Sequence, residues 1–364
     1  MNSLENARKD IERIDKEIAS LFEERMGAAK VVAEYKKERG LPILDAKREK
    51  QLIERNVSYI TNHELEAYYR DFMVSMMGIS KRYQQRLMTG IRVSYSGIEG
   101  SFASISARKI FPEAEKVPCM NFKEAYDAVV SGDCDFAVLP IENSYAGEVG
   151  QVSDLIFDGD LFINGVYELG VSQCLLGVPG TTIESIKTVV SHPQALEQCN
   201  EYIFNHKYRS VQAENTARAA KEISEKGDTS IAAIASAETA ELYGLEILET
   251  DINKSNINVT RFAVLSKCRD IIKTNDEFTT FVLMFIVKHE AGSLAKALSV
   301  IGAYGYNMRV IRSRPLKDHN WEYYFYAEIE GRLSSSNADE MLTMLKPHCE
   351  ELKVVGSYKP NTRI

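Results

Sequence analysis

The first forty residues place the strongest constraint on how this chain can fold. Apolar residues recur there at spacings of three and four, the pattern of one amphipathic helix: Ile11, Ile14, Ile18, Leu21, Phe22, Ala28, Ala29 and Val32. The pattern ends at Gly40-Leu41-Pro42, so the helix would hold roughly 35 residues and measure about 50 Å. A segment of this size cannot cover such a rod by folding back on itself. We therefore expect an intertwined homodimer or a higher homo-oligomer.

Basic side chains lie along this apolar stripe. At 100° per residue Arg25 and Lys36 point into it and Arg8 lies at its edge. A cation that faces a core is costly unless an anion meets it. The anion could be Asp45 or Glu49, the side chains could extend to the surface, or a ligand could supply it. Residues 1–89 carry a net charge of +2 and the remainder −10, which favours an anionic ligand here.

Two shorter helices follow in the sequence. One begins after Asp45, a candidate N-cap, and the other begins at a Thr61-Asn62-His63-Glu64 capping box and runs to about Leu87. The three-helix pattern of residues 4–88 resembles the all-helical chorismate mutases. The resemblance rests on residues that occur in the family's order and spacing: Arg8, Arg25, Lys36, Asp45, Arg48, Glu49, Ser80 and Gln84.

This resemblance implies that the eight residues bind chorismate. The rearrangement to prephenate is pericyclic and needs no base, nucleophile or cofactor. Arg8, Arg25 and Arg48 would hold carboxylates, and Lys36 and Gln84 would be the catalytic residues, stabilising charge on the ether oxygen. The hydroxyl and the surrounding cations would be held by Asp45, Glu49 and Ser80.

Strands and helices alternate from residue 91 to about residue 269, which predicts an α/β domain with two lobes and a cleft. Within it, Phe136–Leu139 reads as a short buried strand that Pro140 ends. The polar residues Glu142, Asn143 and Ser144 follow. Open α/β sheets bind ligands where a buried strand meets such a loop. Further along, Pro193–Phe204 is predicted to be one helix.

Two more loops carry reactive side chains, SHPQAL with Ser191 and Gln198, and NVTRF with Thr260 and Arg261. Together with PIENS they resemble prephenate dehydratase in order over about 175 residues, and the family implies a two-lobed, periplasmic-binding-protein-like fold. Such an enzyme removes carbon dioxide and hydroxide and leaves phenylpyruvate. By this resemblance Thr260 is the general acid, and prephenate is bound by Glu142, Asn143, Ser144, Ser191, Gln198, Thr260 and Arg261. Arg261 could instead form an interlobe salt bridge, and Gln173 stands where the family usually has histidine.

Residues 278–358 spell strand, helix, two strands, helix and strand, a ferredoxin-like layout. They resemble the ACT amino-acid-sensing domain, which implies phenylalanine as an effector. Its binding residues would be Gly292, Ser293, Leu294, Asn307 and Arg314. The usual motifs read GAL and ESRP, so Ser293 and Arg312 depart from them, and Arg312 reverses a charge. The alternative is a module that only dimerises the protein.

Composition excludes other classes of protein. Apolar residues make up 45% and charged residues 26% of the chain, as in ordinary soluble proteins, and no apolar run of roughly 20 residues predicts a membrane span. The charged N-terminus and the six scattered cysteines indicate a cytoplasmic protein with reduced thiols. No ligand-spaced histidines predict a metal, no GxGxxG predicts a dinucleotide, and no basic patch predicts nucleic acid.

These patterns predict a bifunctional enzyme that converts chorismate through prephenate to phenylpyruvate, with phenylalanine as feedback inhibitor. Its expected domains are residues 1–88, 91–269 and 278–358, and it would need no cofactor. Two alternatives remain. The dehydratase could prefer arogenate, or one catalytic module could have decayed to leave an amino-acid-responsive binding protein.

Overall fold

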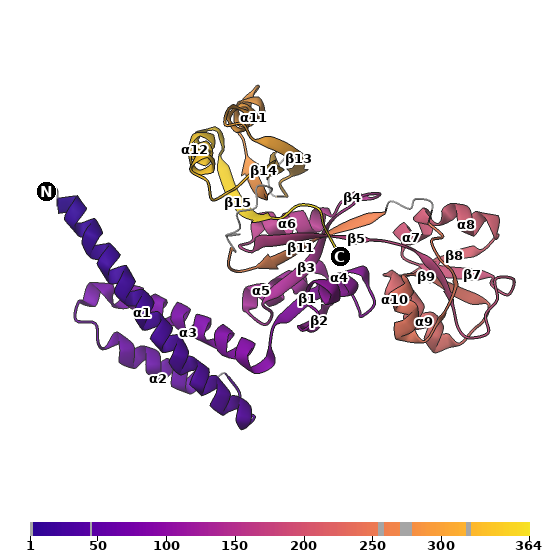
Figure 1. The fold of residues 1–364 in the computed structure, drawn as a ribbon, viewed down its shortest axis with the longest axis horizontal. Helices are drawn as coiled ribbons and strands as arrows, with labels where there is room; N and C mark the ends of the chain where they lie inside the picture. The colour runs from indigo at the N-terminus through magenta and orange to yellow at the C-terminus, as the bar shows by residue number, and fades with distance from the viewer. Residues whose placement is uncertain (1–2, 44–45, 254–257, 270–278, 318–321) are drawn as a thin grey trace. The chain divides into compact units, whose positions relative to one another are not determined.

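The computed structural model describes residues 3–43, 46–253, 258–269, 279–317 and 322–364. The chain divides into two compact units, a helical one up to Arg92 and an α/β one from Val93 onward (Figure 1). Among the described residues, no helix combines the length and hydropathy that a membrane span requires.

The helical unit contains the three helices that the sequence predicts: α1 (Ser3–Glu38), α2 (Ala46–Val57) and α3 (Glu66–Thr89), the last preceded by the 3-10 turn η1 (His63–Leu65). The Asn62 side chain caps that turn by accepting from the Glu64 N–H. Among the residues of α1, all of them described, Ala33 alone is buried. The apolar residues of α1 are largely exposed: Leu4, Ile11, Ile14, Ile18, Leu21, Val31 and Val32. The long helix is therefore unbroken and mostly uncovered.

The α/β unit contains two sheets, as the predicted two lobes require. The first lobe holds β1, β2, β3, β5 and β11 in the order β5-β11-β3-β1-β2. Its elements are β1 (Arg92–Ser96), α4 (Phe102–Ile110), β2 (Glu115–Cys119), α5 (Phe122–Ser131), β3 (Phe136–Asn143), β4 (Gly147–Glu148), α6 (Gly150–Asp158), β5 (Phe162–Gly170) and β11 (Val259–Ser266).

The second lobe has a separate five-stranded sheet in the order β10-β6-β9-β7-β8. Its elements are β6 (Cys174–Gly177), β7 (Thr188–Ser191), α7 (Pro193–Gln198), α8 (Asn200–Asn205), β8 (Arg209–Gln212), α9 (Thr216–Lys226), β9 (Ile231–Ala235), α10 (Ala237–Tyr243) and β10 (Glu246–Glu249). The chain passes between the lobes twice, from β5 to β6 and from β10 to β11. These two crossings bring segments distant in sequence together.

The C-terminal region follows the predicted βαββαβ order. It comprises β12 (Thr280–Ile286), α11 (Ser293–Ala303), β13 (Asn307–Pro315), β14 (Tyr323–Glu330), α12 (Ser336–Leu345), η2 (Lys346–His348), β15 (Glu351–Tyr358) and a short β16 (Thr362–Arg363). The predicted strand starts at Phe278 and Trp321 lie outside the described residues.

The C-terminal sheet is continuous with the sheet of the first lobe. Strand β15 pairs in parallel with β5 at a single position, Gly356 opposite Ile163. Gly356 has φ of 154°, and a Cβ there would overlap the Ile163 carbonyl. A glycine is therefore needed for this close approach of two backbones.

Two predicted boundaries are wrong. Strand β3 continues through Pro140 to Asn143 because β1 pairs only with Phe136–Val138, so proline's missing N–H breaks no bond to β1. The predicted helix at Pro193–Phe204 is split at Cys199, whose ψ is 12°. Apolar periodicity missed this split because residues on both sides of it pack into the same core.

Candidate functional sites

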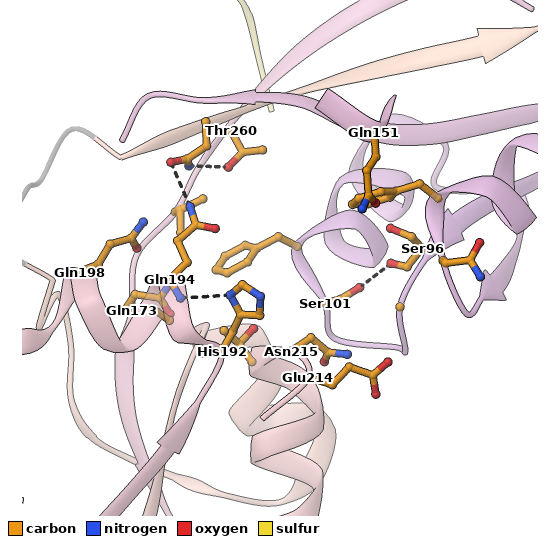
Figure 2. A pocket seen from close by; sticks show the side chains of 18 of the residues that line it. Ser96, Ser101, Gln151, Gln173, His192, Gln194, Gln198, Glu214, Asn215 and Thr260 are labelled. Atoms are coloured by element: carbon orange, nitrogen blue, oxygen red, sulfur yellow. Dashed lines mark hydrogen bonds between the residues drawn. The ribbon is translucent and has the colours of Figure 1, made fainter. Parts of the chain in front are cut away.

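A cavity of about 510 Å³ lies between the two lobes of the α/β unit. The first lobe contributes Ser96, Asn143, Gln151 and Thr260 to its walls, and the second lobe contributes residues that include Gln173, His192, Gln194 and Gln198. Figure 2 shows Thr260 and Gln198 on one side of this cavity and Ser96 and Gln151 on the other. The walls are thus built mainly from uncharged polar side chains.

The hydroxyl of Thr260 is held by the side-chain amide of Asn143. The Asn143 Oδ1 accepts from the backbone N–H groups of Tyr145 and Ala146, at 3.0 and 2.9 Å. This fixes the orientation of the amide, so its Nδ2 faces Thr260 and donates to Oγ1 at 2.9 Å. Because the Thr260 oxygen accepts that bond, its own proton is left to point elsewhere. A hydroxyl arranged in this way can donate to a ligand.

Further amides extend from Asn143 into the second lobe. The Asn143 Nδ2 also donates to Asn258 Oδ1 at 2.8 Å, and the Asn258 Nδ2 donates to Gln198 Oε1 at 2.9 Å. The Gln194 Nε2 donates to Asn143 Oδ1 at 3.2 Å. These bonds connect α7 of one lobe to the ends of β3 and β11 of the other. A movement of the lobes would therefore alter the hydrogen bonds that position Thr260.

Several cavity residues were not predicted from the sequence. His192 lines the cavity, burial lowers the pKa of its imidazole, and its Nδ1 accepts from the Gln194 N–H at 3.3 Å. Ser96 ends β1 and His192 directly follows β7. Both lie at the carboxyl ends of strands, so the rule that ligands bind there could have identified them.

The seven predicted prephenate-binding residues are only partly brought together. Asn143, Gln198 and Thr260 line the cavity. Ser191 is fully buried and donates to the Ile234 carbonyl, and Ser144 accepts from the Val259 N–H at 3.0 Å. The described residues that line the cavity include neither of these serines.

Glu142 and Arg261 also lie outside the cavity lining, on the opposite face of β3 and β11 from Asn143 and Thr260. Successive residues of a strand point to opposite faces, and the pairs Glu142–Arg261 and Asn143–Thr260 are neighbours in register. Arg261 pairs with Glu142 at 2.9 Å and with Glu328 of β14 at 3.0 Å. The structure therefore shows an ion pair for Arg261, but with its own lobe and the C-terminal region rather than across the lobes.

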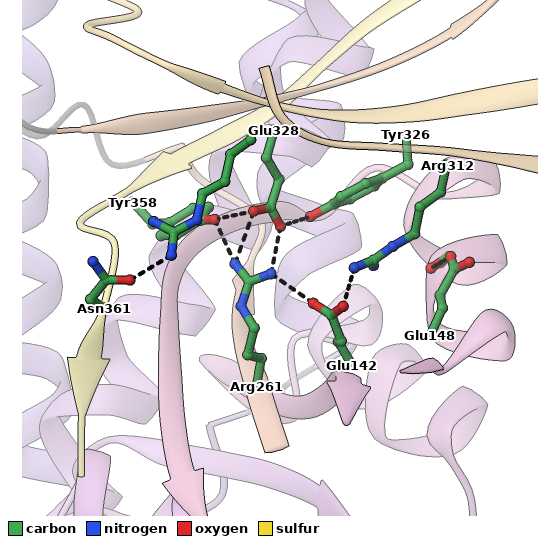
Figure 3. Close-up of polar contacts among 10 residues, drawn as sticks. Glu142, Glu148, Arg261, Arg312, Tyr326, Glu328, Tyr358 and Asn361 are labelled. Carbon is green, nitrogen blue, oxygen red and sulfur yellow. Dashed lines mark hydrogen bonds and ion pairs between the residues drawn. The ribbon is translucent and has the colours of Figure 1, made fainter. Parts of the chain in front are cut away.

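This ion-pair network is partly buried and includes Arg312 (Figure 3). Burial raises the pKa of the Glu142 carboxyl, but hydrogen bonds from Arg312 and Arg261 outweigh that effect and hold the pKa below its ordinary value. Glu328 is fully buried and accepts from the hydroxyls of Tyr326 and Tyr358, at 2.9 and 2.8 Å. Hydrogen-bond donors thus surround this carboxylate, as buried charge requires.

Arg314, a predicted effector-binding residue, contacts α6 of the first lobe. Its Nε donates to Asp154 at 2.9 Å, and Asp154 also accepts from the Tyr324 hydroxyl at 2.9 Å. Burial raises the pKa of Asp154, and these bonds together with Lys317 more than offset it, so the pKa is lowered. A Cβ on Gly150 would overlap the Arg314 guanidinium.

The other predicted effector residues lie apart from Arg314. Gly292, with φ of 83°, precedes α11, and Ser293 is its first residue. Leu294 lines a second cavity of about 410 Å³, which the structure places beside His289, Tyr323 and Phe325. Asn307 donates to Glu330 at 2.9 Å. Within one chain the five residues therefore do not form one pocket.

A third cavity, of about 1110 Å³, lies in the helical unit. Six of the eight predicted chorismate-binding residues line it: Arg25, Lys36, Arg48, Glu49, Ser80 and Gln84. Arg8 is exposed on α1 and is not among the lining residues, and Asp45 lies outside the described residues. The cavity walls also include Lys81, so among the described lining residues four cations face one carboxylate.

Contacts within this cavity position its cations. Arg25 donates to Ser80, Lys36 donates to the Ile43 carbonyl at 2.7 Å, and Lys81 pairs with Glu49 at 3.1 Å. The Oε1 of Gln84 is buried without a hydrogen-bond partner among the described residues. The cavity therefore offers excess positive charge and an amide with bonding capacity for a ligand.

In the part of the chain that the structure describes, no group of three or more His, Cys, Asp or Glu side chains is arranged to hold a metal ion. What the cavities offer instead is cations in the helical unit and, between the lobes, mainly uncharged donors and acceptors with one carboxylate, Glu214. The first set suits an anion, and the second suits a ligand with hydroxyl, carboxylate or keto groups.

Comparison with known proteins assigns both regions. The family model of chorismate mutase type II matches residues 7–85, and that of prephenate dehydratase matches residues 93–270. The bifunctional chorismate mutase/prephenate dehydratase of Aquifex aeolicus is 32% identical over 98% of this chain and 98% of that protein. The arogenate dehydratase/prephenate dehydratase 1 of Arabidopsis thaliana is 36% identical over 74% of this chain and 72% of that protein.

A solved structure gives the same assignment for the α/β unit. The prephenate dehydratase of Arthrobacter aurescens, in complex with L-Phe, matches with a TM-score of 0.68 and 27% identity, over 74% of this chain and 90% of that one. The relative from Aquifex covers both units at once. This chain therefore belongs to the family of bifunctional chorismate mutase/prephenate dehydratases.

Proposed function

We propose that each activity of this bifunctional enzyme has its own cavity, the mutase in the helical unit and the dehydratase between the lobes of the α/β unit. The observation that carries the proposal is the different chemistry of the two. Of the described residues, four cations and one carboxylate line the first, whereas the second is lined around Thr260 by hydroxyls, amides and apolar groups and holds no Lys or Arg, with Glu214 as its carboxylate. A pericyclic step on a dicarboxylate needs the former, and departure of a hydroxyl group needs a donor such as Thr260.

In the mutase cavity the protein acts by binding and by electrostatics. Arg25 and Arg48 would hold the two carboxylates of chorismate, which keeps the substrate folded for the rearrangement. Lys36 and Gln84 would face the ether oxygen, where negative charge builds up as the carbon–oxygen bond breaks. Because the contacts to Ser80 and Ile43 already hold Arg25 and Lys36, little reorganisation would be needed in the transition state.

A second copy of the chain would complete this cavity. Arg8 precedes Arg25 by 17 residues on one continuous helix, a separation of roughly 25 Å, so one chain cannot place both in one site. The apolar residues from Leu4 to Val32 that α1 exposes need a cover of similar length. Pairing of two α1 helices would supply that cover and bring Arg8 of one copy to the cavity of the other.

In the dehydratase cavity Thr260 would donate its proton to the hydroxyl of prephenate as the ring carboxylate departs. The carbon–carbon bond to the carboxylate breaks and gives carbon dioxide, its electron pair completes the aromatic ring, and the carbon–oxygen bond breaks so that the hydroxyl leaves as water. Solvent water then returns a proton to the Thr260 oxygen. Asn143 would direct the Thr260 proton toward the substrate. Formation of the aromatic ring supplies most of the driving force, so a weak acid suffices.

Phenylalanine would act through the C-terminal region, which we propose to be an ACT-type regulatory domain. The Arthrobacter relative is described in complex with L-Phe. Two ion pairs support a coupling, because Arg312 and Arg314 of β13 hold Glu142 of β3 and Asp154 of α6. Glu142 adjoins Asn143, and Asp154 shares α6 with Gln151. A shift of β13 would thus reach two walls of the cavity.

Two substitutions test the separation of the sites. Thr260→Val keeps the shape of the side chain and removes its hydroxyl, so prephenate dehydration should fall by about 100-fold or more, while chorismate is still converted to prephenate. Lys36→Met should lower the conversion of chorismate to prephenate by a similar factor and leave prephenate dehydration unchanged. Both activities are measured spectrophotometrically on purified protein. Thr260→Ser, which restores the hydroxyl, is the matched control and should recover much of the dehydratase activity.

The proposal fails if Thr260→Val dehydrates prephenate at the wild-type rate, or if either variant loses both activities while remaining folded. A second candidate substrate for the same cavity is arogenate, because an Arabidopsis relative bears both names. Values of kcat/KM for the two substrates, measured on the same preparation, decide between them.

A further inference from the structure

Gln173 carries an unused hydrogen-bond acceptor in the wall of the cavity between the lobes. Its side chain is 2% exposed and lines that cavity. The Oε1 atom is buried and has no hydrogen-bond partner among the described residues. Five buried side-chain oxygens share this condition in the described part of the chain, and Gln173 is the residue among them that lines this cavity.

The backbone holds Gln173 in place. It directly precedes β6, at the crossing from the first lobe to the second. Its N–H donates to the Asn253 Oδ1 at 3.0 Å, and its carbonyl accepts from the Ile252 N–H at 3.0 Å. Because both backbone groups are bonded, the Cα of Gln173 is held at the edge of the cavity.

The neighbouring side-chain amides differ from Gln173 in that their oxygens have hydrogen-bond partners. The oxygens of Asn143, Asn258 and Gln198 all accept hydrogen bonds from other side chains or from the backbone. A buried acceptor without a partner is costly, and such groups in native proteins call for an explanation. A ligand that brings a donor into the cavity supplies one.

Prephenate offers one such donor. Its carboxylates and its ketone only accept hydrogen bonds, so its single alcohol is the group that can donate, and this alcohol is also the one that leaves. Thr260 lines the same cavity as Gln173 (Figure 2). An acceptor that takes the alcohol's hydrogen would turn the oxygen lone pairs of the alcohol toward the Thr260 hydroxyl.

We propose that Gln173 binds the departing hydroxyl group of the substrate through its Oε1 and thereby orients it for Thr260. This assignment rests on the proposed dehydratase site. As the hydroxyl leaves with a second proton, the water formed remains a donor, so the bond to Gln173 persists through the transition state. Because this bond orients the alcohol for proton transfer from Thr260, and that alignment is required in the transition state, Gln173 is expected to affect kcat as well as KM.

The test replaces Gln173 by methionine, which keeps the length and loses the acceptor. We expect kcat/KM for prephenate to fall between tenfold and 100-fold, with kcat lowered. The melting temperature should be unchanged or higher, because an unpaired buried amide has been removed. Gln212→Met, at an exposed glutamine of β8, is the matched control and should leave the rate unchanged.

A second variant guards against a folding defect. Gln173→Glu keeps the shape and adds a negative charge, which repels the dianion prephenate more than arogenate, whose ammonium offsets one charge. The ratio of kcat/KM for arogenate to that for prephenate should rise at least tenfold.

The inference is overturned if folded Gln173→Met loses less than tenfold in kcat/KM, or if Gln173→Glu leaves the ratio of kcat/KM for arogenate to that for prephenate unchanged. The Thr260→Val result separates the two possible failures. If Thr260→Val is inactive and Gln173→Met is active, the site stands and the role of Gln173 falls. If Thr260→Val is active, the site itself is misplaced.

Discussion

At the scale of single residues, the orientation of one amide decides which groups the cavity between the lobes can offer to a ligand. The backbone N–H groups of Tyr145 and Ala146 fix the Asn143 oxygen, so only the Nδ2 group is left to face Thr260. The hydroxyl of Thr260 therefore accepts from the protein, which leaves its own proton available to donate to a ligand in the cavity. The sequence motifs PIENS and NVTRF predicted both residues as site residues. The hydrogen bond between them became visible only in the structure.

Asn143→Asp should reverse that arrangement. A carboxylate accepts from the Thr260 hydroxyl instead of donating to it, so the proton is no longer offered to the substrate. We expect kcat for prephenate dehydration to fall by about 100-fold at pH 7, with partial recovery as the pH is lowered and the carboxyl is protonated. A pH–rate profile of the purified variant measures this, and a kcat within threefold of wild type would contradict the assigned geometry.

At the scale of elements, two arginines attach β13 to the first lobe of the α/β unit. They belong to residues 312–315, whose sequence was compared with an effector-binding motif. Arg312 holds Glu142 at the end of β3, and Arg314 holds Asp154 in the middle of α6. Both carboxylates have pKa values below the ordinary range because the bonds to arginine outweigh burial. The reversed charge of Arg312 is thereby explained, since it meets a carboxylate of the same chain.

These lowered pKa values predict how stability changes with acidity. A carboxylate whose pKa is lower in the folded state stabilises the fold above its ordinary pKa of about 4, and that contribution is lost as the pH falls through the folded value. Asp154→Asn should therefore be less stable than wild type at pH 7, and the difference should shrink toward pH 3. Melting temperatures from pH 7 to pH 3 measure it.

The matched control is Glu340→Gln, which alters an exposed carboxylate of α12 and should shift the melting temperature little at either pH. A difference between wild type and Asp154→Asn that stays constant across this range would contradict the role given to the ion pair with Arg314.

At the scale of the whole molecule, the helical unit looks incomplete as a single copy. A partner helix of the same kind, as proposed above, would account both for the exposed apolar side of α1 and for the absence of Arg8 from the described cavity lining. The two lobes and the C-terminal region, by contrast, each have a core of buried apolar residues. The uncovered rod is thus specific to the mutase part.

Mixing two inactive variants tests that explanation. Arg8→Ala and Lys36→Met should each lose mutase activity. The first would lack a cation that binds a substrate carboxylate, and the second would lack the cation that stabilises charge on the ether oxygen. If each site takes Arg8 from one copy and Lys36 from the other, half of the dimers formed from an equal mixture are hybrids with one intact site of two. After dissociation and reassociation, mutase activity should return to about a quarter of wild type.

Recovery near zero would mean that both residues serve one chain, or that Arg8 has no catalytic part. Unmixed samples carried through the same dissociation are the control for simple renaturation, and the dehydratase activity of both variants reports that the α/β unit has refolded.

The sequence by itself determined the elements and the residue types of this protein. Periodicity predicted the long helix, alternation predicted the lobes, and PIENS, SHPQAL and NVTRF marked the loops at strand ends. Those signals are local, because a helix or strand repeats every few residues and a strand end is read from its own composition.

Only the tertiary structure decided which side of each strand faces the cavity between the lobes. Glu142 and Asn143 are neighbours in sequence, as are Thr260 and Arg261, and both pairs were predicted to bind prephenate. In each pair one side chain lines the cavity and the other lies under β13 and β14, because a strand alternates its side chains between two faces. What covers each face comes from segments more than 50 residues away, and no local pattern carries that information.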